Sequence, residues 1–218
     1  MNIAIIGSGV GGLSSAIRLV KKGHTVSIFE RNKTYGGKLG SLKLGRFSFD
    51  TGPSLLTMPH LIDELFTLHD ENPRDYFNYI KKDIHCKYFW DDGTTFTAFS
   101  DKNKYVEEAN RKFLLEKKPL FKYFSKSKKK YDLINKLFLY RPINKLSTFI
   151  NLDTLKALIN IKLFQLFSSL NKVNNRELSN DYMVQVLNRY ATYNGSSPYL
   201  TSGTVSYTHL RAHETMEY

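Results

Sequence analysis

The 218-residue sequence predicts an α/β protein, and three observations lead to that class. A short apolar run at 3–6 is followed by a glycine-rich segment, an amphipathic stretch and a second apolar run. Further on, a polar Asp-Asp-Gly turn at 91–93 separates two alternating segments, which is a strong hairpin signal. The stretch 101–170 is largely periodic at helical spacing. Together these features predict a parallel βαβ start joined to a mixed domain of strands and helices.

The glycine segment is the most informative part of that start. The apolar run at 3–6 reads as a buried parallel strand. After it, Gly7 permits a tight turn, Gly9 lets the backbone approach a pyrophosphate, and Gly12 lets a helix pack against the strand. The helix expected over 12–22 points its N-terminal N–H groups at the phosphates. Its expected buried face is Leu13, Ala16, Ile17 and Val20, and Gly23 is expected to end it.

The second strand, expected at 25–29, ends at Glu30. A carboxylate at this place can accept hydrogen bonds from the ribose hydroxyls of an adenosine. Glycine-rich turns without a ligand are common, so a purely structural turn is the alternative. The order of strand, glycines, helix, strand and acid favours a Rossmann-like dinucleotide site.

A second glycine pair, Gly36-Gly37, followed by Lys38, comes soon after Glu30, and nicotinamide binding does not require it. At these residues the sequence resembles the superfamily of flavin-dependent amine oxidases and carotenoid desaturases. In that superfamily the second pair, usually followed by Arg, lies against the FAD diphosphate. Lys38 keeps the charge of that Arg but loses its bidentate fork.

Four further segments, at 49–59, 63–66, 88–94 and 191–199, narrow the resemblance to bacterial carotenoid (phytoene-type) desaturases. In the first of these segments, the residues Thr51, Ser54 and Met58 look more like the hydroxycarotenoid 3,4-desaturase branch than like phytoene desaturase proper. The resemblance covers about 1–204. It implies FAD as the cofactor, with Gly7, Ser8, Gly9, Gly11 and Gly12 at the pyrophosphate and Glu30 at the adenosine ribose. Gly36, Gly37 and Lys38 would lie beside the diphosphate, and Gly52 and Pro53 near the flavin. Arg31 is also assigned to cofactor binding.

The same resemblance implies a domain plan. Residues 1–75 would be the N-terminal part of an FAD-binding domain, and 76–204 an incomplete substrate and membrane-facing domain, interleaved with it in the complete family fold. Family members are considerably longer, so the chain is expected to be an N-terminal fragment whose sheet lacks strands. Residues 205–218 resemble the translation of a sequencing adapter and are expected to be a non-native tail. His209 and His213 are therefore not treated as a metal pair.

The implied activity is desaturation of a carotenoid by hydride transfer to flavin. A flavin-dependent amine oxidase and a non-catalytic basic module that binds membrane surfaces are the alternatives. No catalytic residue is predicted. Asp50 is interpreted as a turn residue and His60 as a surface residue at a helix start. Trp90 and the many Tyr and Phe side chains are assigned to aromatic core packing, with the lining of a polyene tunnel as the alternative.

The net charge of +12 is concentrated in residues 101–170, which carry a net +10. An anionic membrane surface is the favoured partner of this stretch, beside a lipophilic carotenoid substrate. A merely solvated helical face is the second interpretation, and nucleic-acid binding is not expected because no recognised module accompanies the charge. Cys86 is the single cysteine and is assigned to packing; it cannot form an internal disulfide. No signal peptide and no apolar transmembrane span is expected. A cytoplasmic protein peripheral to the membrane is therefore predicted, with no prediction of oligomeric state.

The remaining elements follow from local signals. A strand pair is expected over 39–49 around Gly45 and a helix over 59–68. Strands at 86–90 and 94–99 flank the Asp-Asp-Gly turn. Breaks in the helical stretch are expected at Pro119 and Pro142, a polar loop at 171–175, and a helix at 179–189 capped by Ser179 or Asn180.

Overall fold

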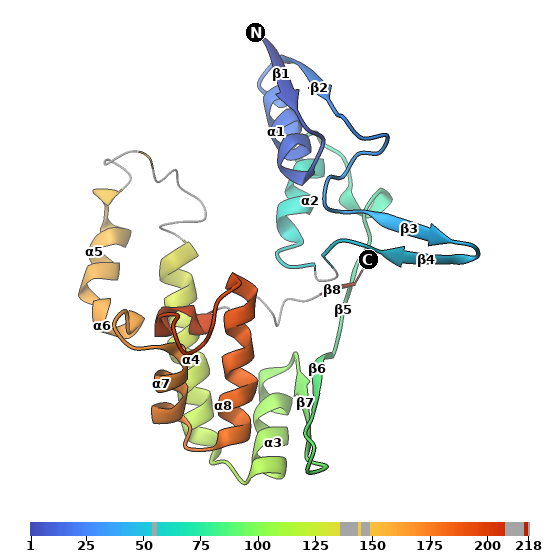
Figure 1. Cartoon of the computed structure of the whole chain (residues 1–218). Coiled ribbons are helices and arrows are strands. Elements are labelled where there is room, and N and C mark those ends of the chain that lie inside the picture. Colours follow the sequence, from blue (N-terminus) through green and yellow to red (C-terminus); the bar gives the residue numbers. More distant parts are fainter. Residues whose placement is uncertain (54–55, 136–143, 145–148, 208–215, 218) are drawn as a thin grey trace. The chain divides into compact units, whose positions relative to one another are not determined.

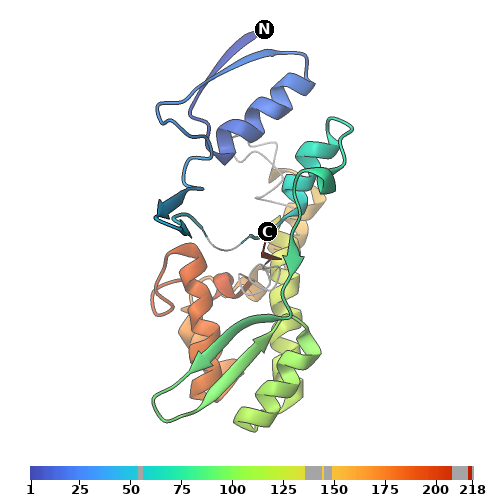
Figure 2. The same ribbon diagram turned by 90° about the vertical axis from the view of Figure 1, so that its right-hand side faces the viewer.

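The structure is a computed structural model that describes residues 1–53, 56–135, 144, 149–207 and 216–217. It contains two compact units, Met1–Lys81 with Thr215–Tyr218 (unit 1) and Lys82–Glu214 (unit 2). Figures 1 and 2 show the elements of both units. The predicted break at Pro142 and the two histidines of the tail lie outside the described residues.

Unit 1 begins with the predicted parallel βαβ arrangement. Strand β1 (Asn2–Ile6) pairs in parallel with β2 (Thr25–Phe29), in a register that joins Ile3 to Val26 and Ile6 to Phe29. Helix α1 (Val10–Lys21) connects them. Gly23 follows with a φ of 81°, and its N–H donates to the Val20 carbonyl, so the predicted glycine stop is confirmed.

The expectation that the first strand is buried is wrong. Ile6 is 92% exposed, and Ala4 and Phe29 are exposed as well. Parallel strands are normally covered on both faces, but here α1 covers one face of a two-stranded sheet. On the expected buried face of α1, Ala16 is buried, whereas Val20 is about half exposed.

The rest of unit 1 agrees with the sequence pattern. Strands β3 (Ser41–Leu44) and β4 (Phe47–Asp50) form the predicted antiparallel hairpin, and helix α2 (His60–Thr67) follows. A 3₁₀ turn, η1 (Pro73–Asp75), leads to the short strand β5 (Ile80–Lys81), which pairs with β8 (Met216–Glu217).

Unit 2 holds the large hydrophobic core. Strands β6 (Ile84–Phe89) and β7 (Thr95–Phe99) form the predicted hairpin, and they pack with α3 (Lys102–Phe113), α4 (Lys117–Ile134) and α8 (Asp181–Asn188). The remaining elements of unit 2 are α5 (Leu152–Ile159), α6 (Ile161–Phe164), α7 (Leu170–Glu177) and the 3₁₀ turns η4 (Arg189–Asn194) and η5 (Gly203–Tyr207).

The aromatic side chains of unit 2 mostly pack on one another. Trp90 meets Phe113 and Tyr182 edge-on, and its Nε1 donates to Gln185 Oε1 at 2.8 Å. The core-packing interpretation of Trp90 is confirmed. Cys86 is half-buried against the same core.

Two local predictions in unit 2 are wrong. The helical break falls at 114–116, before Pro119, which lies in the first turn of α4, where a missing N–H costs no helical hydrogen bond. The expected polar loop at 171–175 lies within α7, which Ser169 caps by accepting from the Lys172 N–H. Helix α8 starts as predicted, with Asn180 as its cap.

Candidate dinucleotide-binding site

The candidate site is built where β1 ends and α1 begins. The Gly7 N–H donates to the Phe29 carbonyl at 2.7 Å, which ties the turn to the end of β2. Gly7 has a φ of 97°, a conformation that favours glycine. An ideal Cβ on Gly12 would lie 2.1 Å from the Gly7 carbonyl oxygen, so only glycine fits without movement. The close packing of helix and strand expected for Gly12 is therefore present.

The second glycine pair lies against the first glycine turn. The Gly36 N–H donates to the Ser8 carbonyl at 2.9 Å, and Gly9 and Gly36 form a parallel bridge. A Cβ on Gly37 would lie 2.9 Å from the Gly9 Cα. Two glycine segments nearly 30 residues apart in sequence thus form one backbone-lined surface.

The acid at the end of β2 points back at this surface. Glu30 Oε2 accepts from the Ser8 N–H at 2.8 Å and from the Ser8 hydroxyl at 2.9 Å. Its other oxygen, Oε1, accepts from the Asn32 N–H at 2.8 Å and from Asn32 Nδ2 at 3.0 Å. These hydrogen bonds, led by the one from the Asn32 backbone, lower the pKa of Glu30 to about 2. The carboxylate is therefore ionised and can only accept, as ribose hydroxyls require.

An anion fits the start of α1. No acidic residue lies in the first helical turn, and no side chain in the described part of the chain caps it. The first N–H groups of a helix lack partners within the helix, and the helix dipole favours negative charge there. Lys38 and Arg31 are exposed, and neither forms an ion pair among the described residues. The residues present thus fit the diphosphate of a dinucleotide.

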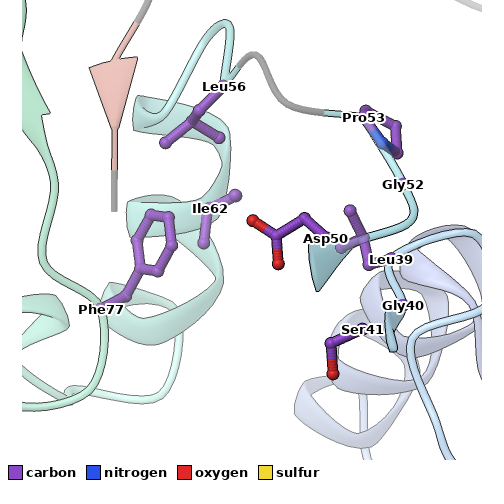
Figure 3. A pocket seen from close by; sticks show the side chains of 9 residues that line it. All are labelled: Leu39, Gly40, Ser41, Asp50, Gly52, Pro53, Leu56, Ile62 and Phe77. Atoms are coloured by element: carbon purple, nitrogen blue, oxygen red, sulfur yellow. The ribbon is translucent and has the colours of Figure 1, made fainter. Parts of the chain in front are cut away.

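A pocket of about 360 Å³ lies beside the second glycine pair (Figure 3). Leu56, Ile62 and Phe77 face it from one side, and the Asp50 carboxylate extends toward them from the end of β4. Gly52 also lines it, and a Cβ there would lie 2.2 Å from the Lys38 carbonyl oxygen. The lining residues are Leu39, Gly40, Ser41, Asp50, Gly52, Pro53, Leu56, Ile62 and Phe77.

Most of the predicted site residues come together in unit 1. Ser8, Gly9, Glu30, Gly36 and Gly37 share hydrogen bonds or direct backbone approach, and Gly52 and Pro53 line the adjacent pocket. Arg31 and Lys38 are near in sequence, but among the described residues no hydrogen bond or ion pair joins their side chains to the cluster. Sequence reasoning missed Asn32, although an Asn two residues after an acid is a common local hydrogen-bonding pattern.

The fold and this geometry define a protein with a Rossmann-type dinucleotide-binding unit. Residues 5–71 match the family model described as an NAD(P)-binding Rossmann-like domain. The chain also resembles a structure of a putrescine oxidase variant with a TM-score of 0.57, at 13% identity, over 99% of this chain and 45% of the other. At that identity the likeness shows the fold alone.

Relatives of known activity narrow the family. The chain is 48% identical over 202 residues to a 1-hydroxycarotenoid 3,4-desaturase of Flavobacterium sp. (strain P99-3), covering 93% of this chain and 41% of that protein. It is 32% identical over 213 residues to a 4,4'-diapolycopene oxygenase of Methylomonas sp, covering 90% and 39%. Both relatives are carotenoid-modifying enzymes by their names, and the chain spans about two fifths of their length. The resemblance predicted from the sequence is confirmed.

Within the part of the chain that the structure describes, no helix is both long enough and apolar enough to cross a bilayer. The same residues contain no group of three or more His, Cys, Asp or Glu side chains that could hold a metal ion.

Proposed function

We propose that this chain forms the cofactor-binding part of an FAD-dependent oxidoreductase that introduces a carbon–carbon double bond into a carotenoid. The observation that carries the proposal is the joint placement of two glycine segments and an ionised Glu30 at the start of α1, in a chain 48% identical to a 1-hydroxycarotenoid 3,4-desaturase. A hydroxylated carotenoid is the substrate class that this relative favours.

The geometry supports the following roles for the chain's own residues. The N–H groups at the start of α1 and the glycine backbones bind the diphosphate, Glu30 accepts from the ribose hydroxyls, and Lys38 adds positive charge. When bound, FAD supplies the electron-pair acceptor for a desaturation in which a hydride and a proton leave adjacent carbons. We propose that the reaction takes place at the apolar pocket beside Gly52.

The test is a titration of the chain with FAD, in which binding is measured by calorimetry and by the flavin absorption spectrum. Stoichiometric uptake is expected, with a Kd raised ten-fold or more by Glu30→Gln because the ribose hydroxyls lose an ionised acceptor. Glu64→Gln is the matched control. It removes the same charge from an exposed carboxylate of α2 that pairs with Arg18. A chain that binds NAD(P) but not FAD would overturn the cofactor assignment.

Two alternatives make different predictions. An amine oxidase of the same fold would be reduced by a diamine such as putrescine and not by a hydroxycarotenoid, with the flavin spectrum as the readout. A non-catalytic module would bind vesicles and take up no FAD. A yellow protein whose bound flavin is reduced by the hydroxycarotenoid and not by the diamine supports the desaturase assignment.

A further inference from the structure

Asp50 carries the one charged side chain among the described residues that line the apolar pocket beside Gly52. Its carboxylate extends toward Leu56, Ile62 and Phe77 (Figure 3). Apart from Ser41, the other lining residues are glycines or carry hydrocarbon side chains. In a pocket that is mostly apolar, the few polar groups fix the orientation of the ligand. Asp50 is therefore the group in this pocket most suited to choosing a ligand.

The hairpin of β3 and β4 explains how an acid comes to line an apolar pocket. Asp50 is the last residue of β4, and the register pairs it with Ser41. The next pair, Leu42 with Phe49, points to the other face of the hairpin, because side chains alternate along a strand. Ser41 and Asp50 thus end the polar face of the hairpin, and both line the pocket.

The Asp50 carboxylate is available to a ligand. Asp50 is exposed, and among the described residues no hydrogen bond or ion pair joins its side chain to another group. Lys43 lies diagonally across the hairpin on the same polar face and forms no ion pair with it. An ionised carboxylate accepts hydrogen bonds and donates none, so its partner must be a hydroxyl, an ammonium or an N–H group.

We propose that Asp50 is the residue that selects a hydroxylated carotenoid. Its carboxylate accepts from the hydroxyl of the substrate, while Leu56, Ile62 and Phe77 contact the hydrocarbon chain. The inference rests on the proposed function, which supplies the carotenoid. In the substrate of the 1-hydroxycarotenoid 3,4-desaturase, the numbering in the name puts the hydroxyl two carbons from the oxidised bond. A carboxylate that holds such a hydroxyl therefore also positions the reacting bond in the same pocket.

An amine is the competing ligand for a carboxylate. A diamine would bring one ammonium to Asp50 and leave the second without an acid among the described lining residues. A metal ion would need more ligands than this one carboxylate, and the described residues contain no suitable group of three. A hydroxyl near the end of an apolar chain matches both the acid and the apolar wall.

The experiment compares two ligands on the full chain. Binding of a 1-hydroxycarotenoid, and of the carotene with the same chain and no hydroxyl, is measured in detergent micelles from the shift of the polyene absorption. We expect the Kd of the hydroxylated ligand to be lower by about ten-fold or more, because a hydrogen bond to a charged acceptor favours it. Equal affinities, or binding of neither ligand, would overturn the proposal.

Variants are judged by the ratio of the two Kd values, since a partial loss of folded chain weakens both ligands alike. Asp50→Leu should bring the ratio close to one. Asp50→Asn keeps a neutral acceptor of the same shape and should give an intermediate ratio. Asp75→Leu is the matched control, because Asp75 is exposed in η1 and lies outside the lining; it should keep the wild-type ratio.

Two results with these variants would overturn the role of Asp50. One is an unchanged ratio in Asp50→Leu. The other is displacement of the hydroxylated ligand by putrescine from the wild-type chain, which would assign the carboxylate to an amine.

Failure of this proposal and failure of the proposed function give different results. Both carotenoids are titrated without FAD, and FAD is titrated separately. Uptake of FAD with equal affinities for the two carotenoids overturns only the role of Asp50. A preference for the hydroxyl in a chain that takes up no FAD overturns only the cofactor assignment.

Discussion

The tightest backbone approach in the site is that of Gly12 to Gly7, where one added carbon meets a carbonyl oxygen at 2.1 Å. Gly12→Ala must therefore separate α1 from β1, and we expect a loss of about 2 kcal/mol or more in the free energy of unfolding. Gly11→Ala is the control. Apart from its chain neighbours and the backbone of its own helix, no atom of the described residues lies within 4 Å of its Cβ, and alanine in a helix gains up to about 1 kcal/mol. Urea denaturation of the two apo variants measures the difference. Equal stabilities would contradict the close packing.

Glu30 gives a pH prediction. Its pKa is lowered from 4.5 to about 2 by hydrogen bonds from Asn32 and Ser8, so its contribution to stability is complete above pH 4.5 and disappears as the pH falls toward 2. In Glu30→Gln the stability of unit 1 should fall less steeply across that window than in the wild type. Circular dichroism of urea unfolding at several pH values measures the slopes. Parallel slopes would show that the carboxylate is not held by these donors.

Sequence spacing predicted the glycines and Glu30 because each obeys a local backbone requirement: a turn, a close approach, a strand end. It could not predict Phe77 or Ile62, because these side chains reach the pocket through the folding of α2 and η1 and carry no motif. Asn32 lies between these cases, since it is local to Glu30 but its contact depends on how the chain turns after β2.

At the level of elements, α7 shows why the polar segment 171–175 is a helix. Asn174 is fully buried; its Oδ1 accepts from the Tyr123 hydroxyl at 2.8 Å, and its Nδ2 donates to Asn188 Oδ1 at 2.9 Å. Asparagine disfavours helices because its side chain competes for backbone groups. Here residues of α4 and α8 form hydrogen bonds with the Asn174 side chain, so tertiary contacts override the local preference.

Asn174→Ala removes partners from two buried groups, and we expect a loss of about 2–3 kcal/mol in the free energy of unfolding. Asn175→Ala, one position along on the exposed side of α7, should change it by about 0.5 kcal/mol or less. Chemical denaturation followed by Trp90 fluorescence reports on this unit. A similar cost at both positions would mean that helix propensity, and not the buried network, is being measured.

The β1–β2 pair shows which features the sequence predicts and which it does not. The strand type and the parallel pairing follow from the apolar runs and the connecting helix, and both agree with the structure, whereas the predicted burial does not. Burial depends on what covers the second face of a sheet, and that is decided by elements far away in sequence.

At the level of the whole molecule, the two units are built very differently. The buried hydrophobic cluster is entirely in unit 2, whereas the buried apolar side chains of unit 1 among the described residues are Ala16 and Met58. Unit 2 also carries most of the excess positive charge. The proposed cofactor site therefore lies in the unit with the smaller core.

Separate unfolding of the two units is the consequence. Scanning calorimetry of the apo chain should show two transitions, the lower one from unit 1. FAD at about a hundred times its Kd should stabilise unit 1 by about 2.7 kcal/mol and raise only the lower transition. Trp90, packed against Phe113 and Tyr182, should follow the upper transition with or without FAD. Glu30→Gln should reduce the FAD shift of the lower transition and leave the upper one in place. If FAD raised both transitions together, unit 1 and unit 2 would unfold as one cooperative block, and the cofactor would stabilise the core of unit 2 through unit 1.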